Sequence, residues 1–452
     1  MRIRFDRGTL LFEVDRRHPN VSALPGVMWD PRVGAYRAPA YRYGKIIAEL
    51  DDRGIGISDE VSLHRRIPGR FHRIELRPYQ EAALDAWELS GRRALVVLPT
   101  GSGKTRVALA AASRCLSSAV CLVPTRVLLD QWCREISRVY AGPIGRLGDG
   151  DRRVEAITVS TFESAYRHMP RLGNRFGMLV VDEAHHFGGK VKDEAIEMCI
   201  AEARLGLTAT PPAPGEAAER LADLIGPTSY ELLISDLTGQ FLADLDLITI
   251  SVDLTPPERR CYEAEMGRFR PVFLRFRRLS PTSSWTDFVR SAYRTPEGRC
   301  ALDSWRRARK LLAFPRRKAE AVRMLLRRHR NARVLVFTTD NETAYNIAQT
   351  HLIMPITCDI GRTEREEALE RFHKGELSAL VSARVLNEGM DVPEANVAVV
   401  VGGAMGRREH VQRVGRILRP AQGKRALVYE LVVRGTGEVR QAFRRRQGLG
   451  SR

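Results

Sequence analysis

Two short segments of the chain combine residue types and spacings that suit phosphate chemistry. The first, residues 98–105, reads LPTGSGKT and follows an apolar run. Its glycines lack a Cβ, so backbone N–H groups can close around phosphate oxygens where the next helix is expected to begin. Lys104 supplies a point charge for the outer phosphates, and Thr105 supplies a hydroxyl for Mg²⁺. The usual motif opens with glycine where this chain has Leu98. The residues expected to hold a nucleoside triphosphate are Thr100, Gly101, Ser102, Gly103, Lys104 and Thr105.

The second segment, residues 180–186, reads VVDEAHH and also follows an apolar run. Asp182 lies where a strand would end, and its carboxylate suits the coordination sphere of the metal together with Thr105. Glu183 can orient or deprotonate the attacking water. Because both segments occur in this order, each after a strand-like run, the sequence predicts hydrolysis of the bound triphosphate.

A third segment with catalytic potential is QRVGRILR, residues 412–419. Helical spacing places Gln412, Arg416 and Arg419 on one face of a helix. An arginine-rich helix is usually a solvated face, but guanidinium groups delivered from another lobe can stabilise charge on the γ-phosphate. Given the phosphate loop upstream, we expect arginine fingers here. The expected catalytic residues are Lys104, Asp182, Glu183, Gln412, Arg416 and Arg419.

These residues need two sets of strands to position them. Short apolar runs alternate with helical patterns between residues 93 and 210, and a second alternation begins at residue 333. Alternation of this kind predicts parallel sheets covered by helices. The strands expected in the first set are 94–98, 119–123, 156–160, 178–182 and 204–208, and those in the second are 334–339, 379–382, 397–403 and 426–432. The expected domains are an α/β module (1–70), a first lobe (71–245), a basic helical insertion (246–320) and a second lobe (321–452).

The chain is strongly basic, with a formal net charge of +19. Residues 256–330 contribute 21 basic and 7 acidic residues, a net charge of +14. Positive charge beside aromatic rings suits a nucleic-acid backbone and its bases. The alternative is a solvated helical insertion whose aromatic rings form its own core. The rings in question are Tyr262, Phe269, Phe273, Phe276, Trp285, Phe288, Tyr293 and Trp305.

Other classes of protein are disfavoured by composition. The sequence contains no apolar run of 18 residues and its first 15 residues lack the apolar core of a signal peptide, so we expect no membrane span. Seven scattered cysteines without a C-x-x-C spacing argue against an iron–sulfur cluster and fit buried thiols in a reducing cytoplasm. The cysteines are residues 115, 121, 133, 199, 261, 300 and 358.

Taken together, these segments resemble the superfamily 2 helicases, and more closely the short archaeal-type members of the XPB family of DNA repair and transcription motors. The resemblance covers essentially the whole chain, including its ending YELVVRGTGE (429–438). The ordered set of motifs is LRPYQ (76–80), LPTGSGKT (98–105), VPTRVLLDQW (123–132), VSTFESA (159–165), VVDEAHH (180–186), GLTAT (206–210), SARVLNEGMDVP (382–393) and QRVGRILRP (412–420).

The resemblance implies two RecA-like lobes, ATP as the nucleotide, and 3′→5′ action on duplex or forked DNA. It identifies residues 1–70 with a damage-recognition module and the basic stretch with a thumb. It also implies roles for individual residues at matching positions. These are adenine contact by Arg77 and Gln80, coupling of hydrolysis to movement by His185, Thr208 and Thr210, contact with the strand backbone by Pro124, Thr125, Arg126 and Thr161, and sensing of nucleotide and DNA by Glu388, Gly389 and Asp391.

One departure affects the expected activity. Close relatives carry an Arg-Glu-Asp element after the Thr-Ala-Thr motif, thought to help separate strands, whereas residues 211–216 read PPAPGE here. Arg220 and Asp223 follow, but at a different spacing. The resemblance therefore implies ATP-driven movement on duplex more firmly than strand separation.

Three readings remain open at this point: a DNA translocase or helicase, the motor of a restriction or remodelling system, and a nucleic-acid scaffold switched by ATP. RNA is also a possible substrate, because contacts to phosphates do not distinguish it from DNA. The resemblance further implies a companion nuclease as partner. We expect a monomeric motor associated with the nucleoid in the cytoplasm.

Overall fold

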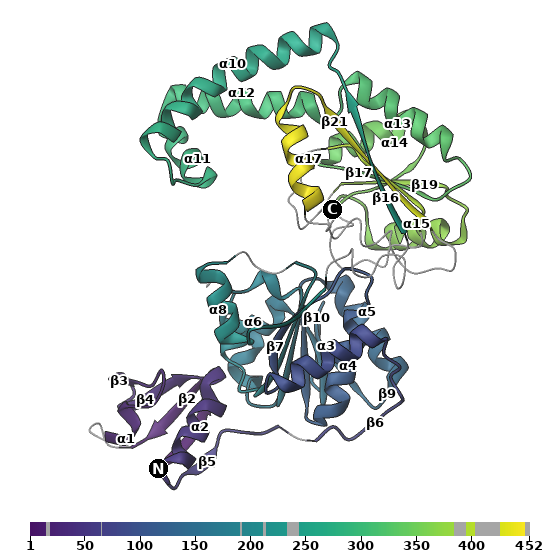
Figure 1. The fold of residues 1–452 in the computed structure, drawn as a ribbon. Helices are drawn as coiled ribbons and strands as arrows, with labels where there is room; N and C mark the ends of the chain where they lie inside the picture. The colour runs from purple at the N-terminus through teal and green to yellow at the C-terminus, as the bar shows by residue number, and fades with distance from the viewer. Residues whose placement is uncertain are drawn as a thin grey trace. The chain divides into compact units, whose positions relative to one another are not determined.

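The computed structural model describes residues 1–14, 19–64, 66–189, 192–210, 214–232, 244–383, 395–402 and 425–447 (Figure 1). The chain divides into two compact units, the first containing the described residues up to 232 and the second those from 244 onward. Each unit contains a parallel sheet covered by helices, which confirms the expected fold class.

The N-terminal module is a small five-stranded sheet with the order β3-β4-β2-β1-β5. Arg7 and Gly8 both have positive φ in the tight turn between its first two strands, where glycine relieves the steric strain. Ile46 and Leu50, four residues apart on α2, are fully buried against the sheet. The elements are β1 (Arg2–Asp6), β2 (Thr9–Glu13), α1 (Pro19–Ser22), β3 (Met28–Asp30), β4 (Ala35–Pro39), η1 (Ala40–Arg42), α2 (Tyr43–Asp52) and β5 (Ser58–Glu60).

The first lobe is an eight-stranded sheet with the order β11-β10-β12-β8-β13-β14-β7-β15. All pairs are parallel except β10 with β11. The strands are β7 (Arg93–Val97), β8 (Ala119–Val123), β10 (Ile144–Gly148), β11 (Asp151–Arg153), β12 (Ile157–Thr161), β13 (Met178–Asp182), β14 (Ala203–Thr208) and β15 (Thr228–Glu231), with a two-stranded ribbon of β6 (Arg70–Phe71) and β9 (Tyr140–Ala141) beside them. The helices are α3 (Pro78–Leu89), α4 (Lys104–Cys115), α5 (Arg126–Val139), α6 (Phe162–Leu172), η2 (Ala184–His186), α7 (Glu194–Glu197) and α8 (Glu216–Leu224).

The five strands predicted for this lobe are confirmed to within one residue at either end. They form the centre of the sheet, where both faces are covered and the sequence is continuously apolar. Strands β10 and β15, which lie outside these five, were not predicted, because their sequences IGRLG and TSYE lack such a run.

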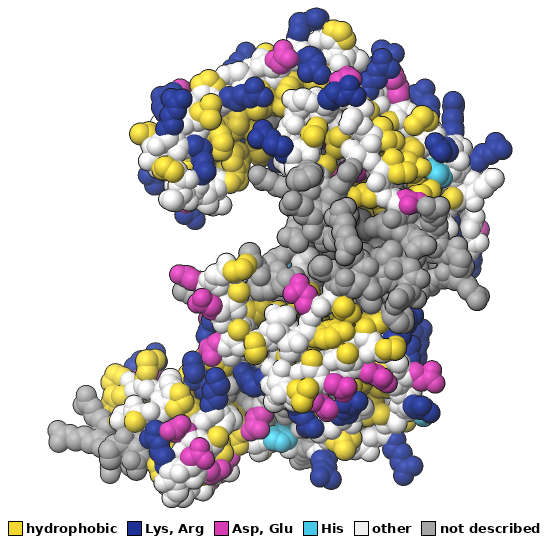
Figure 2. Space-filling view, in the orientation of Figure 1, with side chains coloured by type: hydrophobic (Ala, Val, Ile, Leu, Met, Phe, Trp, Pro, Cys, Tyr) yellow, Lys and Arg dark blue, Asp and Glu magenta, His cyan; other side chains and the backbone are white. Residues whose placement is uncertain are grey.

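The basic insertion consists of three helices, of which α10 and α12 run alongside each other (Figure 1). Both begin with proline directly after a threonine N-cap, a position where the missing N–H costs nothing. Lys and Arg side chains cover much of the surface of these helices (Figure 2). Their bounds are α10 (Pro256–Leu279), α11 (Trp285–Tyr293) and α12 (Pro296–Ala313).

The second lobe is a six-stranded parallel sheet with the order β16-β21-β20-β17-β19-β18. Residues 246–252, which the sequence placed at the start of the basic insertion, instead lie in β16 and pair with residues 427–433 of β21. Burial of Ile250 and Val252 against the lobe core explains this correction. The elements are β16 (Asp244–Val252), α13 (Arg316–Arg328), β17 (Val334–Thr338), α14 (Asn341–His351), β18 (Met354–Ile356), α15 (Arg362–Lys374), β19 (Ala379–Ala383), β20 (Val397–Val400), β21 (Arg425–Val433) and α17 (Gly437–Gln447).

All seven cysteines are free thiols, but they are not all buried as expected. Cys121 and Cys199 are buried, whereas Cys261, Cys300 and Cys358 are exposed. The exposed thiols lie on the basic insertion and the second lobe. Within the described residues, no helix is long and apolar enough to cross a membrane.

Candidate nucleotide and nucleic-acid site

The phosphate loop lies between β7 and α4, with Gly103 as the N-cap of the helix. Gly101 and Gly103 have φ values of +83° and +80°, in the left-handed region that favours glycine. A Cβ on Gly103 would lie 2.5 Å from the Gln80 amide nitrogen. The Thr100 hydroxyl oxygen is buried and accepts or donates no hydrogen bond within the described part of the chain. A loop with glycines in the left-handed region and an uncommitted hydroxyl fits phosphate oxygens.

The start of α3 braces this loop from one side. Gln80 Nε2 donates to the Ser102 carbonyl oxygen at 2.7 Å, while its Oε1 accepts from the Arg77 backbone N–H at 2.9 Å. The Tyr79 hydroxyl donates to the same carbonyl at 2.8 Å. The structure thus brings Gln80 to the phosphate loop and places Arg77 beside Tyr79, to whose hydroxyl it donates at 3.3 Å; their contact with adenine stays a prediction. Sequence reasoning missed Tyr79, which has no signal of its own inside LRPYQ.

Lys104, Asp182 and Glu183 meet at the carboxyl edge of the sheet. Lys104 Nζ donates to the carbonyl oxygens of Leu98 and Pro99 at 3.2 and 3.3 Å. β14 lies between β7, which leads into the phosphate loop, and β13, which ends at Asp182. Burial and the neighbouring Glu183 charge raise the pKa of Asp182 to about 6, although Lys104 acts to lower it. The arrangement suits a divalent cation, whose charge would favour the ionised carboxylate.

Trp132 holds the Asp182 carboxylate from α5. Its indole Nε1 donates to Asp182 Oδ2 at 2.9 Å, and the Glu183 backbone N–H donates to Oδ1 at 3.0 Å. Both donors stabilise the charged form of the carboxylate. Glu183 itself adopts a left-handed conformation with φ of +51°, which places it at the start of η2 rather than in β13. The role of Trp132 also escaped the sequence, because only the tertiary structure joins α5 to the end of β13.

The three residues expected to couple hydrolysis to movement lie in one hydrogen-bonded chain. The Thr208 hydroxyl donates to the Thr210 carbonyl oxygen at 2.9 Å and accepts from the Thr210 backbone N–H at 3.2 Å. Its single proton is thereby committed, so His185 Nδ1, at 3.1 Å, must be the donor in their shared bond. His185 Nδ1 also lies 3.3 Å from Glu183 Oε2. The geometry links Glu183 to the end of β14, while a coupling function stays a prediction.

The residues expected to contact a nucleic-acid backbone lie at the ends of β8 and β12, which are paired in the sheet. Thr125 caps α5 and Thr161 caps α6 by accepting from backbone N–H groups at 3.3 and 3.2 Å. Arg126 is largely exposed and pairs with Asp149 at 2.7 Å. Pro124 directly precedes the Thr125 cap. Two helix N-termini, which can bind phosphate groups, thus lie at this edge, and contact with a nucleic-acid backbone stays a prediction.

Six expected site residues lie outside the described residues, and their placement is therefore untested. They are Glu388, Gly389, Asp391, Gln412, Arg416 and Arg419.

The aromatic residues of the basic insertion mostly face one another. Phe288 is 1% exposed, and its ring lies 5.0 to 5.9 Å from the rings of Phe269, Phe273, Phe276 and Trp285. The interpretation of these rings as a stacking surface for bases is therefore wrong for Phe269 and Phe288, which are buried in the core of the helical insertion, whereas Trp285 is 40% exposed. Tyr293, at 48% exposed, remains on the surface. The charge of the insertion is a separate observation.

Comparison with known families matches three consecutive parts of the chain. Residues 3–61 match the Xeroderma pigmentosum group B helicase damage recognition domain. Residues 73–213 match the type III restriction enzyme res subunit, and residues 317–421 match the helicase conserved C-terminal domain.

Two relatives and one solved structure extend over most of the chain. The DNA 3′-5′ translocase XPB2 of Sulfurisphaera tokodaii is 35% identical over 425 residues, which cover 94% of this chain and 96% of that protein. The DNA 3′-5′ helicase XPB of Mycobacterium tuberculosis is 29% identical over 87% of this chain and 67% of its own length. The Hef helicase domain of Pyrococcus furiosus matches in fold with a TM-score of 0.55, at 19% identity, over 82% of this chain and 98% of that domain.

Proposed function

Since the chain belongs to the XPB family of superfamily 2 DNA helicases and translocases, we propose that ATP hydrolysis in its first lobe drives 3′→5′ movement along duplex DNA, or its opening, in nucleotide excision repair or transcription. The observation that carries the proposal is the carboxyl edge of the first sheet. There the phosphate loop follows β7, the Asp182–Glu183 pair lies at the end of β13, and the helix caps Thr125 and Thr161 lie at the ends of β8 and β12 of the same sheet.

The residues at this edge divide the chemistry between them. The backbone of the loop and Lys104 would hold the phosphates, and Thr105 with Asp182 would hold Mg²⁺, which lowers the negative charge that attack must overcome. Glu183 would orient the attacking water and accept its proton. His185 lies next to Glu183 and shares a hydrogen bond with Thr208. A movement of the Glu183 side chain would therefore displace the residues that follow β14. Arg416 and Arg419 would stabilise the charge that develops on the γ-phosphate.

Replacement of Lys104 tests the nucleotide site directly. Lys104→Ala should abolish ATP turnover, because no other described lysine lies at the phosphate loop to replace its charge. Turnover is measured with duplex, forked and single-stranded DNA and with RNA, beside a strand-displacement assay. Turnover that survives the substitution would contradict the assignment of the site.

Replacement of Arg419 tests the proposed finger. Arg419→Ala should lower kcat by about 10³-fold with little loss of nucleotide affinity, because a finger acts mainly on the transition state. Nucleotide affinity is measured by titration with a non-hydrolysable analogue. A variant that loses only affinity would show that Arg419 binds the ground state and is not a finger.

Translocation on duplex without strand separation is the second candidate. Arg220 and Asp223, which follow the site of the missing Arg-Glu-Asp element, are engaged with each other and with Tyr41 of the N-terminal module. Residues committed to internal contacts do not replace a strand-separating element. DNA-stimulated turnover without strand displacement is the result that favours this candidate. A monomeric state and a companion nuclease remain proposals, testable by light scattering and co-purification.

A further inference from the structure

The N-terminal module and the first lobe interlock through their cores. Tyr41 of the module belongs to the core cluster of the lobe, and Ile200 of the lobe belongs to that of the module. At the turn of the module's first hairpin, a Cβ on Gly8 would lie 2.3 Å from the Met198 side chain. A Cβ on Gly44 would lie 3.0 Å from Glu202. The module therefore packs on residues 198–202. These lie between the DEAH segment, residues 182–185, and β14.

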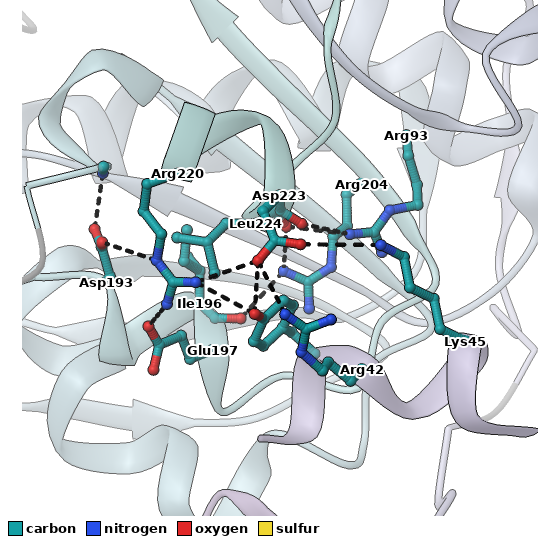
Figure 3. Close-up of polar contacts among 12 residues, drawn as sticks. Arg42, Lys45, Arg93, Asp193, Ile196, Glu197, Arg204, Arg220, Asp223 and Leu224 are labelled. Atoms are coloured by element: carbon teal, nitrogen blue, oxygen red, sulfur yellow. Dashed lines mark hydrogen bonds and ion pairs between the residues drawn. The ribbon is translucent and has the colours of Figure 1, made fainter. Parts of the chain in front are cut away.

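Tyr41 connects this interface to α8, where Arg220 and Asp223 contact each other (Figure 3). Its hydroxyl donates to Asp223 Oδ2 at 2.7 Å and accepts from Arg220 Nη1 at 3.2 Å. Burial raises the pKa of Tyr41, and the hydrogen bond to Asp223 adds to the effect, so the phenol stays neutral and keeps its proton. The Arg42 and Arg220 guanidinium groups lie 5.0 and 5.6 Å from the centre of its ring.

Arg220 reaches from Tyr41 to the loop that follows the DEAH segment. Its Nε lies 3.7 Å from Asp193 Oδ2, and Asp193 Oδ1 accepts from the Gly188 backbone N–H at 2.8 Å. Asp193 is fully buried. Gly188 has a φ of +90°, and a Cβ there would lie 2.3 Å from the Ala217 carbonyl oxygen of α8. Two contacts with α8 thus fix the backbone at Gly188: direct packing on Ala217, and the hydrogen bond to Asp193, which pairs with Arg220.

A second buried arginine shows what a purely structural role looks like here. Arg204 is fully buried, and its guanidinium donates to the carbonyl oxygens of Ile196, Cys199, Ala201 and Leu224. Burial lowers its pKa to about 10, which leaves it cationic at neutral pH. All four acceptors belong to the first lobe. The Arg204 guanidinium also lies 5.9 Å from the centre of the Tyr41 ring. Arg220 differs because it hydrogen-bonds the Tyr41 hydroxyl and also pairs with Asp193 and with Glu197 of α7.

We propose that Arg220 is a positioning residue that couples the N-terminal module to the DEAH segment (182–185) of the first lobe. The connection runs through Tyr41 on one side and through Asp193 and Gly188 on the other. A displacement of the module by DNA moves Tyr41, and the shared guanidinium transmits it to Asp193 and hence to Gly188. The inference rests on the proposed function, in which the module contacts DNA and the first lobe hydrolyses ATP. Coupling of this kind requires a physical connection with a measurable free energy between the two sites.

Two substitutions test the coupling in the full chain. Arg220→Gln removes the charge, and Tyr41→Phe removes only the hydroxyl. Each should lower the stimulation of ATP turnover by duplex DNA by about fivefold or more, the lower end of ordinary coupling between sites. The basal rate and the DNA affinity should each change by less than about twofold. The double variant should lose little more than either single variant, because both act through one connection.

The matched controls keep similar chemistry at neighbouring positions. Tyr43→Phe removes a hydroxyl that donates to Asp59 inside the module, and Arg53→Gln breaks an exposed pair with Glu49 on one helix. Both should retain full stimulation. Variants at Arg220 and Tyr41 that keep stimulation would overturn the inference. So would a parallel loss of basal turnover, stimulated turnover and melting temperature, which is the signature of a merely structural role.

A second measurement does not depend on DNA or on turnover. Hydrogen exchange of the Gly188 amide should become faster in both Arg220→Gln and Tyr41→Phe, because the hold on its acceptor Asp193 is weakened. Unchanged exchange would overturn the connection even if stimulation fell. A wild-type chain that DNA does not stimulate, with faster Gly188 exchange in the variants, would instead overturn the proposed function and leave the connection standing.

Discussion

At the scale of single residues, Asp182 shows how the first lobe keeps a carboxylate ready for a cation. Burial opposes its charge, whereas the Trp132 indole and the Glu183 backbone N–H favour it. A pKa of about 6 means that the side chain binds a proton in mildly acidic solution. Because only the ionised form serves a metal, loss of turnover should accompany protonation as the pH falls.

Trp132→Phe should move the acidic limb of ATP turnover to higher pH. The substitution removes a hydrogen bond to the charged form, so the pKa of Asp182 rises further above its usual range. A hydrogen bond to a charged group corresponds to a shift of about one pH unit. The measurement is kcat/KM against pH at a fixed, subsaturating Mg²⁺ concentration.

A second buried tryptophan of the same lobe provides the control. Trp87 Nε1 donates to the Arg204 carbonyl oxygen at 2.9 Å and touches no carboxylate of the site. Trp87→Phe should leave the limb in place. An unshifted profile in Trp132→Phe would mean that Asp182 does not set the acidic limb.

At the scale of elements, the sequence predicted those whose burial pattern is uniform and missed those whose burial is one-sided. The central strands β8, β12 and β13 are buried along their whole length, and an apolar run of five residues identifies such a strand. In β10 two of the five residues are glycine, and β16 at the sheet edge carries Asp244, Asp246, Thr249 and Ser251. Nothing local distinguishes such segments from loops, because a partner strand distant in sequence stabilises them.

The same limit explains the basic insertion. Aromatic side chains at helical spacing suit either a core or a ligand surface, and only packing between helices decides which. Here α10, α11 and α12 bury the rings of Phe269 and Phe288 between them. The nucleotide site was easier to predict from the sequence, because its motif residues lie next to one another along the chain. Trp132 and Tyr41 were not predicted, because only the fold brings them to their partners.

Phe288→Ala should destabilise the helical insertion by about 3–5 kcal/mol, the usual cost of removing a buried aromatic ring from a small core. Hydrogen exchange across α10, α11 and α12 would report the loss locally. Basal ATP turnover should persist, because the ring belongs to the core of the helical insertion and not to the first lobe, which contains the phosphate loop. Leu279→Ala, at a position 79% exposed on α10, is the control and should have little effect. A cost below about 1 kcal/mol for Phe288→Ala would show that the aromatic cluster is not a core.

At the scale of the whole molecule, the excess of positive charge is concentrated outside the nucleotide site. Many arginines of the basic insertion pair with carboxylates of the insertion itself, such as Arg275 of α10 with Glu297 of α12 at 2.5 Å and Arg307 of α12 with Glu265 of α10 at 2.9 Å. Arg278 and Arg294 are exposed and form no ion pair within the described residues. Arginines such as Arg278 and Arg294 can bind a phosphate without first breaking an ion pair, whereas the paired arginines cannot. Whether the insertion contacts a phosphate backbone can therefore be read from these positions.

The combined variant Arg278→Gln and Arg294→Gln should weaken DNA binding and lower the steepness of its salt dependence. Each phosphate that an arginine neutralises releases about one counterion, so the slope of log K against log salt should fall by about 1 for each arginine removed from a phosphate. Binding is measured at several salt concentrations on duplexes of unrelated sequence, and the weakening should be similar on all of them, because phosphates carry no sequence information. Arg275→Gln, paired with Glu297, is the matched control and should change the slope less. An unchanged slope in the combined variant would exclude these two arginines from the DNA path and leave the charge of the insertion as a solvated surface.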